Sequence, residues 1–349
     1  MNSDFLIAGA GVAGLATAQR LLLQGASVTV VERGAVGRES SWAGGGILAP
    51  LCPWSYPDEV TRLTSLGASL FPQWAAGLYA AAGIDPEYEV SGMLVLPPFE
   101  RTVAQQWCRE HKFLVEQKDD GLLLPSVAQV RNPRLVQALR KHVEILGGRI
   151  VENCKVTQVT TESGQVNFIR TTQGELSAGR YVVCAGAWSK QLLGPHALQL
   201  DIKPIRGQML LYKFPAPPLP HIVLQDGMYL IPRRDGHLLV GSTLEDVGFD
   251  KSTTEDARVS LQQRAQLLLP ALKDMPLVQH WSGLRPASPG NIPTVGQHPQ
   301  LQNLYLNSGH FRYGVTMAPA SVEILLNELN GVAQPFDISP YRAGWGAEK

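Results

Sequence analysis

The chain has 349 residues, of which 44% are hydrophobic and 17% are charged, which is enough for two globular domains with sizeable cores. Lys and Arg number 30 and Asp and Glu number 30, so the formal net charge is zero. This balance argues against nucleic acid, an anionic membrane surface or a strongly charged substrate as partner.

Four cysteines stand far apart in the chain, at positions 52, 108, 154 and 184, with no C-x-x-C pair. This spacing argues against a disulfide framework or a structural zinc site and favours buried free thiols in a reducing compartment. The apolar N-terminus lacks the basic residues of a signal peptide, and no uninterrupted apolar run reaches membrane-spanning length. We therefore expect a cytoplasmic protein with no membrane span and no bound metal.

The chain opens with a strand–helix–strand pattern. The predicted elements are a buried parallel strand at Phe5–Ala8, a helix at Val12–Gln24 and a second strand at Val28–Val31. Between the first strand and the helix, Gly9, Gly11 and Gly14 have the spacing G-x-G-x-x-G. The first glycine permits a sharp turn, the second permits close approach of a pyrophosphate, and the third permits close packing of the helix on the sheet.

Glu32 ends the second strand, where a carboxylate can accept hydrogen bonds from a ribose diol. The phosphates of the same ligand would bind free N–H groups at the helix N-terminus. A lone glycine pattern arises easily by chance in a chain with 34 glycines. Because the strand, helix, second strand and acid all accompany it, the pattern predicts dinucleotide binding.

A second glycine-rich stretch, residues 37–50, carries Ser40, Ser41, three consecutive glycines and the apolar pair Ile47-Leu48. Such a composition is poorly suited to the interior of a helix or strand and is typical of backbone that lies against a ligand. A flexible surface linker is the alternative, but linkers seldom carry a tryptophan or an apolar pair. We therefore predict ligand contact along this stretch.

The rest of the chain alternates between helical and strand patterns. Helices are predicted at Pro57–Ala82, around Trp107, at Pro133–Leu146, from a capping box at Ser252–Glu255 to Leu269, and from about Thr316 to Asn330. Strands are predicted at Gly92–Pro97, Arg149–Val151, Lys155–Thr160, Gln165–Thr171, Arg180–Ser189 (ending in a glycine turn), Met228–Ile231, His237–Gly241, Val278–Leu284 and Leu304–Asn307.

Prolines crowd the segment after Lys203, and the antiparallel hairpin that follows differs from the start of the chain. The sequence therefore predicts an α/β fold in which a Rossmann-like nucleotide-binding domain carries an inserted α+β substrate domain with an antiparallel sheet. The nucleotide-binding domain is expected at residues 1–85, 130–203 and 281–349. The substrate domain is expected at residues 86–129 and 204–280.

With its later motifs included, the chain resembles the FAD-dependent D-amino acid oxidase superfamily over nearly its whole length. Within it the chain is most similar to the bacterial glycine oxidases, the amine oxidases of the thiamine pathway. The segments that carry this resemblance are the glycine pattern with Glu32, Ser40-Ser41 with Gly45-Gly46-Ile47, Val183–Ser189, Tyr229–Arg233, Trp281–Pro286 and Gly309–Gly314. The last three resemble the substrate-facing motifs of the family and are far more specific than the glycine pattern.

The resemblance implies a bound FAD. The residues that it assigns to this cofactor are Gly9, Gly11, Val12, Ala13, Gly14, Glu32, Arg33, Ser40, Ser41, Gly45, Gly46, Ile47, Val156, His310, Phe311, Arg312, Tyr313, Gly314, Val315 and Thr316. Residues 287–290 offer no cysteine where sarcosine oxidases tether their flavin, so the FAD should be non-covalent.

The resemblance also implies a substrate clamp. It assigns Arg285 and Tyr229 to the substrate carboxylate, and Arg312 to a further charge whose backbone carbonyl accepts a hydrogen bond from the substrate amine. Gly227 stands where close relatives often have histidine, and Ile47 and Leu244 stand where relatives differ in the pocket wall. These departures leave the preferred substrate side chain open.

The residue types suit this chemistry. A guanidinium holds a carboxylate through two parallel hydrogen bonds, which fix its orientation. Judged without the resemblance, Arg285 and Arg312 are more often surface charges or structural ion pairs. No side chain emerges as an obligatory general base, which is consistent with hydride transfer from a neutral amine to the flavin. The helix near Thr316 would direct its positive end toward the flavin.

We therefore expect an FAD-dependent oxidase that converts glycine, or another small amine such as sarcosine or a small D-amino acid, to an imine. Hydrolysis of the imine gives glyoxylate or a 2-oxo acid and ammonia, and molecular oxygen is reduced to hydrogen peroxide. The resemblance implies a role in making the thiazole of thiamine.

Three other functions stay open at this point. One is a D-amino acid dehydrogenase that passes electrons to a quinone. Another is the flavin domain of a tRNA-modifying enzyme, against which the zero net charge argues. A third is a nucleotide-binding regulatory module without turnover. The sequence also leaves the oligomeric state open, with a homo-oligomer among the alternatives.

Overall fold

The computed structural model describes residues 3–346 of the chain. Its α-helices are α1 (Val12–Leu23), α2 (Ser40–Ala43), α3 (Asp58–Ala82), α4 (Arg101–Glu110), α5 (Asn132–Ile145), α6 (Ser189–Leu193), α7 (Glu255–Leu268), α8 (Gly314–Asn330) and α9 (Ser339–Arg342). Its strands as far as the middle of the chain are β1 (Ser3–Ala8), β2 (Val28–Val31), β3 (Glu89–Val90), β4 (Met93–Leu96), β5 (Glu116–Lys118), β6 (Gly121–Leu124), β7 (Ala128–Gln129), β8 (Arg149–Val151), β9 (Val156–Glu162), β10 (Gln165–Thr171), β11 (Gly174–Leu176) and β12 (Ala178–Val183). The later strands are β13 (Lys203–Lys213), β14 (Ile222–Gln225), β15 (Met228–Pro232), β16 (His237–Gly241), β17 (Leu277–Ala287), β18 (Thr294–His298) and β19 (Leu301–Ser308).

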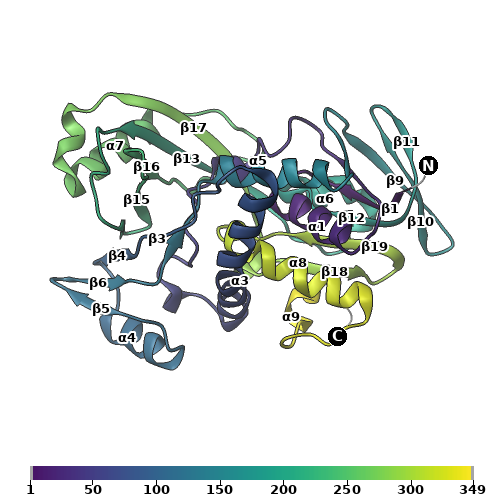
Figure 1. Cartoon of the computed structure of the whole chain (residues 1–349), viewed down its shortest axis with the longest axis horizontal. Helices are drawn as coiled ribbons and strands as arrows, with labels where there is room; N and C mark the ends of the chain where they lie inside the picture. Colours follow the sequence, from purple (N-terminus) through teal and green to yellow (C-terminus); the bar gives the residue numbers. More distant parts are fainter. Residues whose placement is uncertain (1–2, 347–349) are drawn as a thin grey trace.

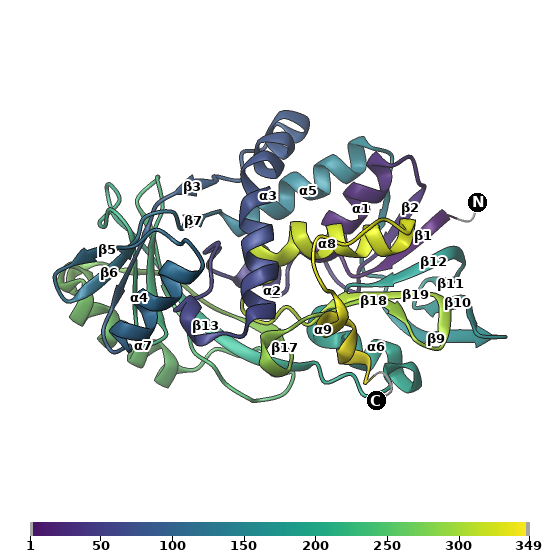
Figure 2. The same ribbon diagram turned by 90° about the horizontal axis from the view of Figure 1, so that it is seen from below.

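A six-stranded sheet of order β18-β19-β12-β1-β2-β8 is parallel from β19 to β8, and its edge strand β18 pairs antiparallel. Its inner strands are short apolar runs because both faces are covered. Helices α1, α3, α5 and α8 pack on one face, and the small β9–β11 sheet packs on the other (Figure 2). This arrangement confirms the predicted α/β fold with a Rossmann-like parallel sheet.

An eight-stranded sheet of order β17-β13-β16-β15-β14-β4-β6-β5 lies beside the first (Figure 1). Its pairings are antiparallel except between β14 and β4, and its strands come from two separate stretches of the chain. Apolar side chains fill both of its faces, under α4 and α7. We propose that this sheet is the core of the inserted domain. Strand β17 crosses the proposed boundary at residue 281 and so joins the two parts.

Two local predictions need correction. Ser40–Ala43 forms one helical turn in the stretch judged unsuitable for helix, because the Ser41 hydroxyl accepts a hydrogen bond from the Val12 N–H (3.0 Å) and fixes the turn against α1. Helix α7 is capped by Thr254, whose Oγ1 accepts from the Ala257 N–H (3.4 Å), and not by Ser252. The Ser252 hydroxyl instead donates to Asp250 (2.9 Å) and accepts from the Arg206 guanidinium (3.2 Å), so it is engaged outside the helix.

Helix α8 begins at Gly314, slightly before the predicted start, and its first turn lies against α3. Gly67 makes this approach possible, because a Cβ there would lie 2.0 Å from the carbonyl oxygen of Thr316. The Thr316 hydroxyl also donates to the Ile47 carbonyl (3.2 Å). These contacts fix the N-terminus of α8 beside the glycine-rich stretch.

The four cysteines are free thiols, and Cys52 is the least buried of them. Within residues 3–346, no helix is long and apolar enough to cross a membrane. The same residues contain no group of three or more His, Cys, Asp or Glu side chains arranged to hold a metal ion.

Candidate active site

A cavity of about 460 Å³ lies at the carboxyl ends of β1, β2 and β12 and extends to the eight-stranded sheet. Its size falls within the range of cofactor and small-molecule sites. Ligands of open α/β sheets bind at this edge, outside the carboxyl ends of the strands. The position of the cavity therefore agrees with the ligand edge of a dinucleotide-binding fold.

Almost every residue predicted to bind a ligand lines this one cavity. The predicted residues on its wall are Gly9, Gly11, Val12, Ala13, Glu32, Arg33, Ser40, Ser41, Gly45, Gly46, Ile47, Val156, Tyr229, Arg285, His310, Phe311, Arg312, Tyr313, Gly314, Val315 and Thr316. Gly14 lies behind the wall, where a Cβ would stand 1.9 Å from the Gly9 carbonyl oxygen. Its role is therefore to let α1 approach β1.

The N-terminus of α1 forms an anion cradle in the cavity wall. Gly9 has φ +114°, and a Cβ there would lie 2.4 Å from the carbonyl oxygen of Cys184 at the end of β12. The N-cap residue of α1, Gly11, has no side chain to cap the helix, and the Val12 N–H donates to Ser41. Among residues 3–346 the N–H groups of Ala13 and Gly14 have no acceptor. Unsatisfied N–H groups at a helix N-terminus suit phosphate oxygens, so the cradle fits a pyrophosphate.

Glu32 is buried, and its carboxylate is held by backbone N–H groups. Oε2 accepts from the Ala10 N–H (2.8 Å) and Oε1 from the Gly34 N–H (3.1 Å). The carboxylate is therefore fixed at the cavity wall with acceptor capacity to spare, since each oxygen has more than one lone pair. This geometry suits the ribose role predicted for it.

If Glu32 binds the adenosine ribose, Glu32→Ala should weaken FAD binding while turnover of the FAD-saturated protein stays near normal. A lost hydrogen bond to a charged group is worth roughly 1.5–3 kcal/mol, which corresponds to about a tenfold to hundredfold rise in the FAD dissociation constant. Fluorescence titration of apoprotein with FAD measures this constant. The exposed Glu110 is the control, and an unchanged constant in Glu32→Ala would contradict the ribose role.

Arg33 and Trp188 close one side of the cavity. The guanidinium carbon of Arg33 lies 3.4 Å from the Trp188 ring centroid, and Arg33 pairs with Glu39 (2.5 Å). Lys251 reaches the same Glu39 from the loop after β16 (3.1 Å). Because a cation stacked on an indole is held in place, Trp188 orients Arg33. The sequence marked Trp188 only as part of a glycine turn.

The N-terminus of α8 brings positive potential to the opposite wall. No acidic residue occupies its first turn, and among residues 3–346 the N–H groups of Gly314, Val315 and Thr316 have no acceptor. The helix dipole and these N–H groups together stabilise negative charge that lies close to the helix end. This confirms the predicted helix and supports its proposed role toward an electron-rich ligand.

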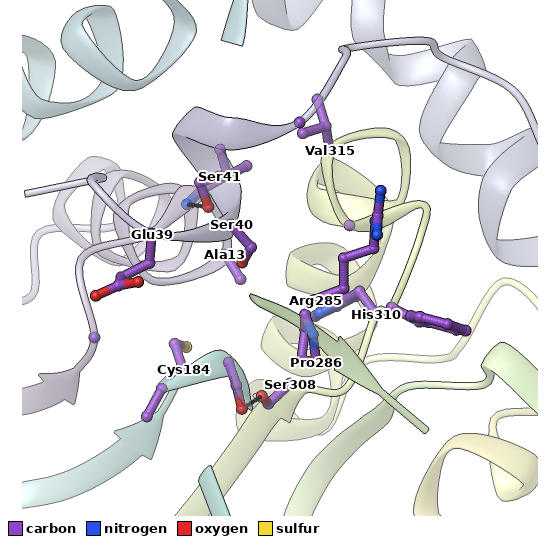
Figure 3. Close-up of a pocket in the computed structure, with 18 of the residues that line it drawn as sticks. Ala13, Glu39, Ser40, Ser41, Cys184, Arg285, Pro286, Ser308, His310 and Val315 are labelled. Atoms are coloured by element: carbon purple, nitrogen blue, oxygen red, sulfur yellow. Dashed lines mark hydrogen bonds between the residues drawn. The ribbon is translucent and has the colours of Figure 1, made fainter. Parts of the chain in front are cut away.

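His310 stands at the same wall, next to Arg285 and Pro286 (Figure 3). It is buried, and burial lowers its pKa to about 4, so the imidazole is neutral at pH 7. Its Nε2 has no hydrogen-bond partner among residues 3–346. A buried polar atom of this kind is normally satisfied, so Nε2 is available to a ligand.

Arg285 projects from the end of β17 at the end of the cavity nearest the eight-stranded sheet. It donates to the Thr243 carbonyl (3.1 Å) and to the Ser242 hydroxyl (2.5 Å). Its guanidinium lies directly over Gly207 of β13, where a Cβ would stand 2.0 Å from a guanidinium nitrogen. The sequence does not mark Gly207 as a site residue, although a glycine inside a strand often indicates such a close approach.

Arg285, Arg312 and Tyr229 form a cationic end of the cavity. Neither arginine forms a salt bridge with a carboxylate of residues 3–346. Burial lowers the pKa of Arg285, the neighbouring Tyr229 hydroxyl opposes that shift, and Arg312 adds to it. Within the described part of the chain, the Tyr229 hydroxyl has only a weak partner, the sulfur of Met209 at 3.8 Å. Two guanidiniums with no counter-ion among residues 3–346, beside a weakly bonded hydroxyl, suit an anionic ligand.

Asn132 is a further lining residue that the sequence did not single out. Asn132 is 1% exposed, and both polar atoms of its carboxamide lack partners among residues 3–346. It lies against Gly44 and Gly46, where a Cβ would stand 2.9 Å and 2.6 Å from its amide nitrogen and oxygen. In the sequence, Asn132 before Pro133 indicates only the start of a helix, so the contact of its side chain with Gly44 and Gly46 could not be predicted.

A helix N-terminus suited to phosphate, a buried carboxylate at the cavity wall and a second helix N-terminus on the opposite wall, all in a Rossmann-like fold, agree with a flavin-dependent oxidoreductase. The chain belongs to the FAD-dependent oxidoreductase family, whose sequence profile matches residues 4–327. The lining residues described above fit FAD: the N-terminus of α1 would hold its pyrophosphate, and the N-terminus of α8 would face its flavin. The recognition of this family from the sequence is thereby confirmed.

Three relatives show how far the similarity extends. The chain is 41% identical over 358 aligned positions to a glycine oxidase of Pseudomonas aeruginosa, covering 98% of each chain. It is 32% identical to a bifunctional ThiO/ThiG protein of Trichormus variabilis, over 93% of this chain and 52% of that protein. Its fold matches the crystal structure of a glycine oxidase from Geobacillus kaustophilus with a TM-score of 0.93, at 25% identity over 97% and 98% of the two chains.

Proposed function

We propose that the protein oxidises glycine, or a comparably small amine such as sarcosine or a small D-amino acid, with non-covalent FAD and molecular oxygen. The observation that carries this proposal is the cationic end of the cavity, where Arg285 and Arg312 have no counter-ion among residues 3–346 and lie beside the Tyr229 hydroxyl. A substrate carboxylate supplies the missing negative charge. The similarity to glycine oxidases over nearly the whole chain supports the same conclusion.

The chain's own residues would act by binding and orientation. Arg285 holds the carboxylate through two parallel hydrogen bonds, and the Tyr229 hydroxyl adds a third donor. The Arg312 carbonyl accepts from the amine, which orients the Cα–H bond. FAD, when bound, supplies the acceptor for the electron pair of that bond.

No side chain needs to accept a proton in this scheme, provided that the amine binds in its neutral form. His310 at the cavity wall is neutral at pH 7, as shown above. Burial raises the pKa of the Cys184 thiol to about 12, so this lining cysteine is not a thiolate. Ile47 and Leu244 line the cavity, and their bulk favours a small substrate side chain.

The test is oxygen uptake by the purified yellow protein with glycine, sarcosine and D-alanine. We expect turnover with at least one of them, release of FAD on denaturation, and hydrogen peroxide without any added acceptor. A D-amino acid dehydrogenase would instead need a quinone, and a regulatory module would show no turnover with either acceptor. Colourless protein that cannot take up FAD would contradict the proposal, because the proposed reaction depends on bound FAD.

The similarity to ThiO/ThiG proteins supports a place in the thiamine pathway, where the imine or glyoxylate product would be used. The four free thiols suit a reducing compartment, and we propose a cytoplasmic enzyme. A homo-oligomer is compatible with this function, and sedimentation of the FAD-loaded protein measures its state.

A further inference from the structure

Arg233 is a buried cation that the scheme above does not use. It directly follows β15 and is 5% exposed. Its guanidinium donates to Gln129 Oε1 (2.7 Å), the Val130 carbonyl (2.9 Å) and the Gly45 carbonyl (2.6 Å). Among residues 3–346 it forms no salt bridge with a carboxylate. The positive charge is therefore held by neutral dipoles alone.

Keeping this charge in the interior is costly, since a buried cation without an ion-pair partner loses hydration that neutral dipoles only partly replace. The nearby carboxylates of Glu87 and Asp235 pair with Arg131. Burial, followed by repulsion from Arg131, lowers the pKa of Arg233 to about 10, so it still carries its charge at neutral pH. A neutral side chain of similar length would fill the site without this cost, which points to a use for the charge.

The Gly45–Gly46 peptide links Arg233 to the cavity. Gly45 and Gly46 line the cavity, whereas Arg233 does not. In a planar trans peptide the N–H points away from the C=O, so the Gly46 N–H points away from Arg233. Among residues 3–346 this N–H has no acceptor. A charged donor on the carbonyl polarises the peptide and strengthens its N–H as a donor.

The same peptide is held against the strand that carries Tyr229. A Cβ at Gly45 would lie 2.6 Å from Ile231 Cδ1 and 3.2 Å from Tyr229 Cε2. Tyr229 and Ile231 belong to β15, and Arg233 follows directly. Arg233 thus fixes the glycine-rich stretch to the strand that carries Tyr229, and its hydrogen bond to the Gly45 carbonyl polarises the Gly45–Gly46 peptide.

We propose that Arg233 is a positioning residue that transmits positive charge through the Gly45–Gly46 peptide to bound FAD, and so favours the reduced, negatively charged flavin. The inference rests on FAD binding, to which the family membership points, and not on which amine is oxidised. It assigns a role to the final residue of the Tyr229–Arg233 motif.

Sulfite titration of the FAD-loaded enzyme tests this proposal. Sulfite adds to an oxidised flavin and leaves negative charge on it, and no amine substrate is needed. For Arg233→Met, which removes the charge and the donors, we expect the sulfite dissociation constant to rise roughly tenfold to a hundredfold. The two-electron midpoint potential should fall by roughly 30 to 60 mV, at about 30 mV per factor of ten.

Arg234→Gln is the matched control. Arg234 is the next residue, is about half exposed and pairs with Glu89 (3.0 Å), so its loss should leave both quantities unchanged. Arg233→Lys keeps a charge and should recover part of the sulfite affinity. If the methionine variant does not fold, Arg233→Gln serves as the second variant, and the loss of charge should again raise the sulfite constant roughly tenfold.

A purely structural Arg233 would give a lower melting temperature and less bound FAD, but a normal sulfite constant in FAD-saturated protein. A sulfite constant within a factor of two of the parent would overturn the proposal. An equal change in Arg234→Gln would overturn it as well, because any nearby charge would then suffice. Either outcome leaves the glycine proposal standing, since oxygen uptake tests that separately.

Discussion

Replacing Arg285 with alanine should lower kcat/KM for glycine by roughly 10²- to 10³-fold or more. A carboxylate brought into the cavity loses hydration and must regain it from a fixed partner. Without the guanidinium that charge is left largely unpaired, which costs on the order of 3–5 kcal/mol. Steady-state oxygen uptake over a range of glycine concentrations measures the effect. The FAD spectrum should stay nearly unchanged, because the loss lies in substrate binding and orientation.

Arg285→Lys should recover only part of the activity, because an ammonium cannot form two parallel bonds with a carboxylate. Arg170→Ala is the control for loss of an arginine, since Arg170 is an exposed side chain that pairs with Glu175. If Arg285→Ala keeps a near-parental kcat/KM, either Arg312 binds the substrate carboxylate instead of Arg285, or the substrate is not an amino acid.

The nucleotide half of the site could be predicted from local sequence because its signals are local. Gly9, Gly11 and Gly14 follow a strand and open a helix, and Glu32 ends the next strand. Each of these residues acts through its own backbone or within one strand–helix–strand unit. In the structure Gly9, Gly11 and Glu32 line one cavity, and Gly14 lies directly behind its wall. A short-range sequence pattern is sufficient to predict this.

The proposed substrate half of the site could be located only through the resemblance of the chain to a family. Arg285 comes from β17, Tyr229 from β15 and Arg312 from the turn before α8. Nothing in their sequence spacing shows that the three share one cavity, because sheet pairing and loop closure between distant segments bring them together. The resemblance supplied that long-range information for these three residues.

Residues that act through other residues could not be predicted either, because their contacts also join distant segments of the chain. Gly207 is an ordinary strand glycine until the guanidinium of Arg285 is seen to lie over it. Arg233 could be recognised as part of a motif, but its contact with Gly45 spans distant parts of the chain. Such roles become visible only when distances between segments are known.

Gly14→Ala should abolish or strongly weaken FAD binding and destabilise the fold. The added Cβ would lie 1.9 Å from the Gly9 carbonyl oxygen and 3.3 Å from the Cys184 Cβ. The first overlap is with backbone, so no side-chain rotation relieves it, and α1 must move away from β1. Overpacking of this kind costs about 3 kcal/mol or more. The melting temperature of the purified variant measures that cost.

The same shift carries the Ala13 and Gly14 N–H groups away from the phosphate site. Loss of two hydrogen bonds to a charged phosphate should raise the FAD dissociation constant by on the order of 10²-fold or more. Gly77→Ala is the matched control, because Gly77 lies inside α3 and, beyond its chain neighbours and the backbone of its own helix, no atom of residues 3–346 lies within 4 Å of an added Cβ. That variant should bind FAD normally and be more stable by roughly 0.5–1 kcal/mol, since alanine is the better helix former. Yellow Gly14→Ala protein with full FAD content and an unchanged melting temperature would mean that α1 does not need its close contact with β1 to hold the cofactor.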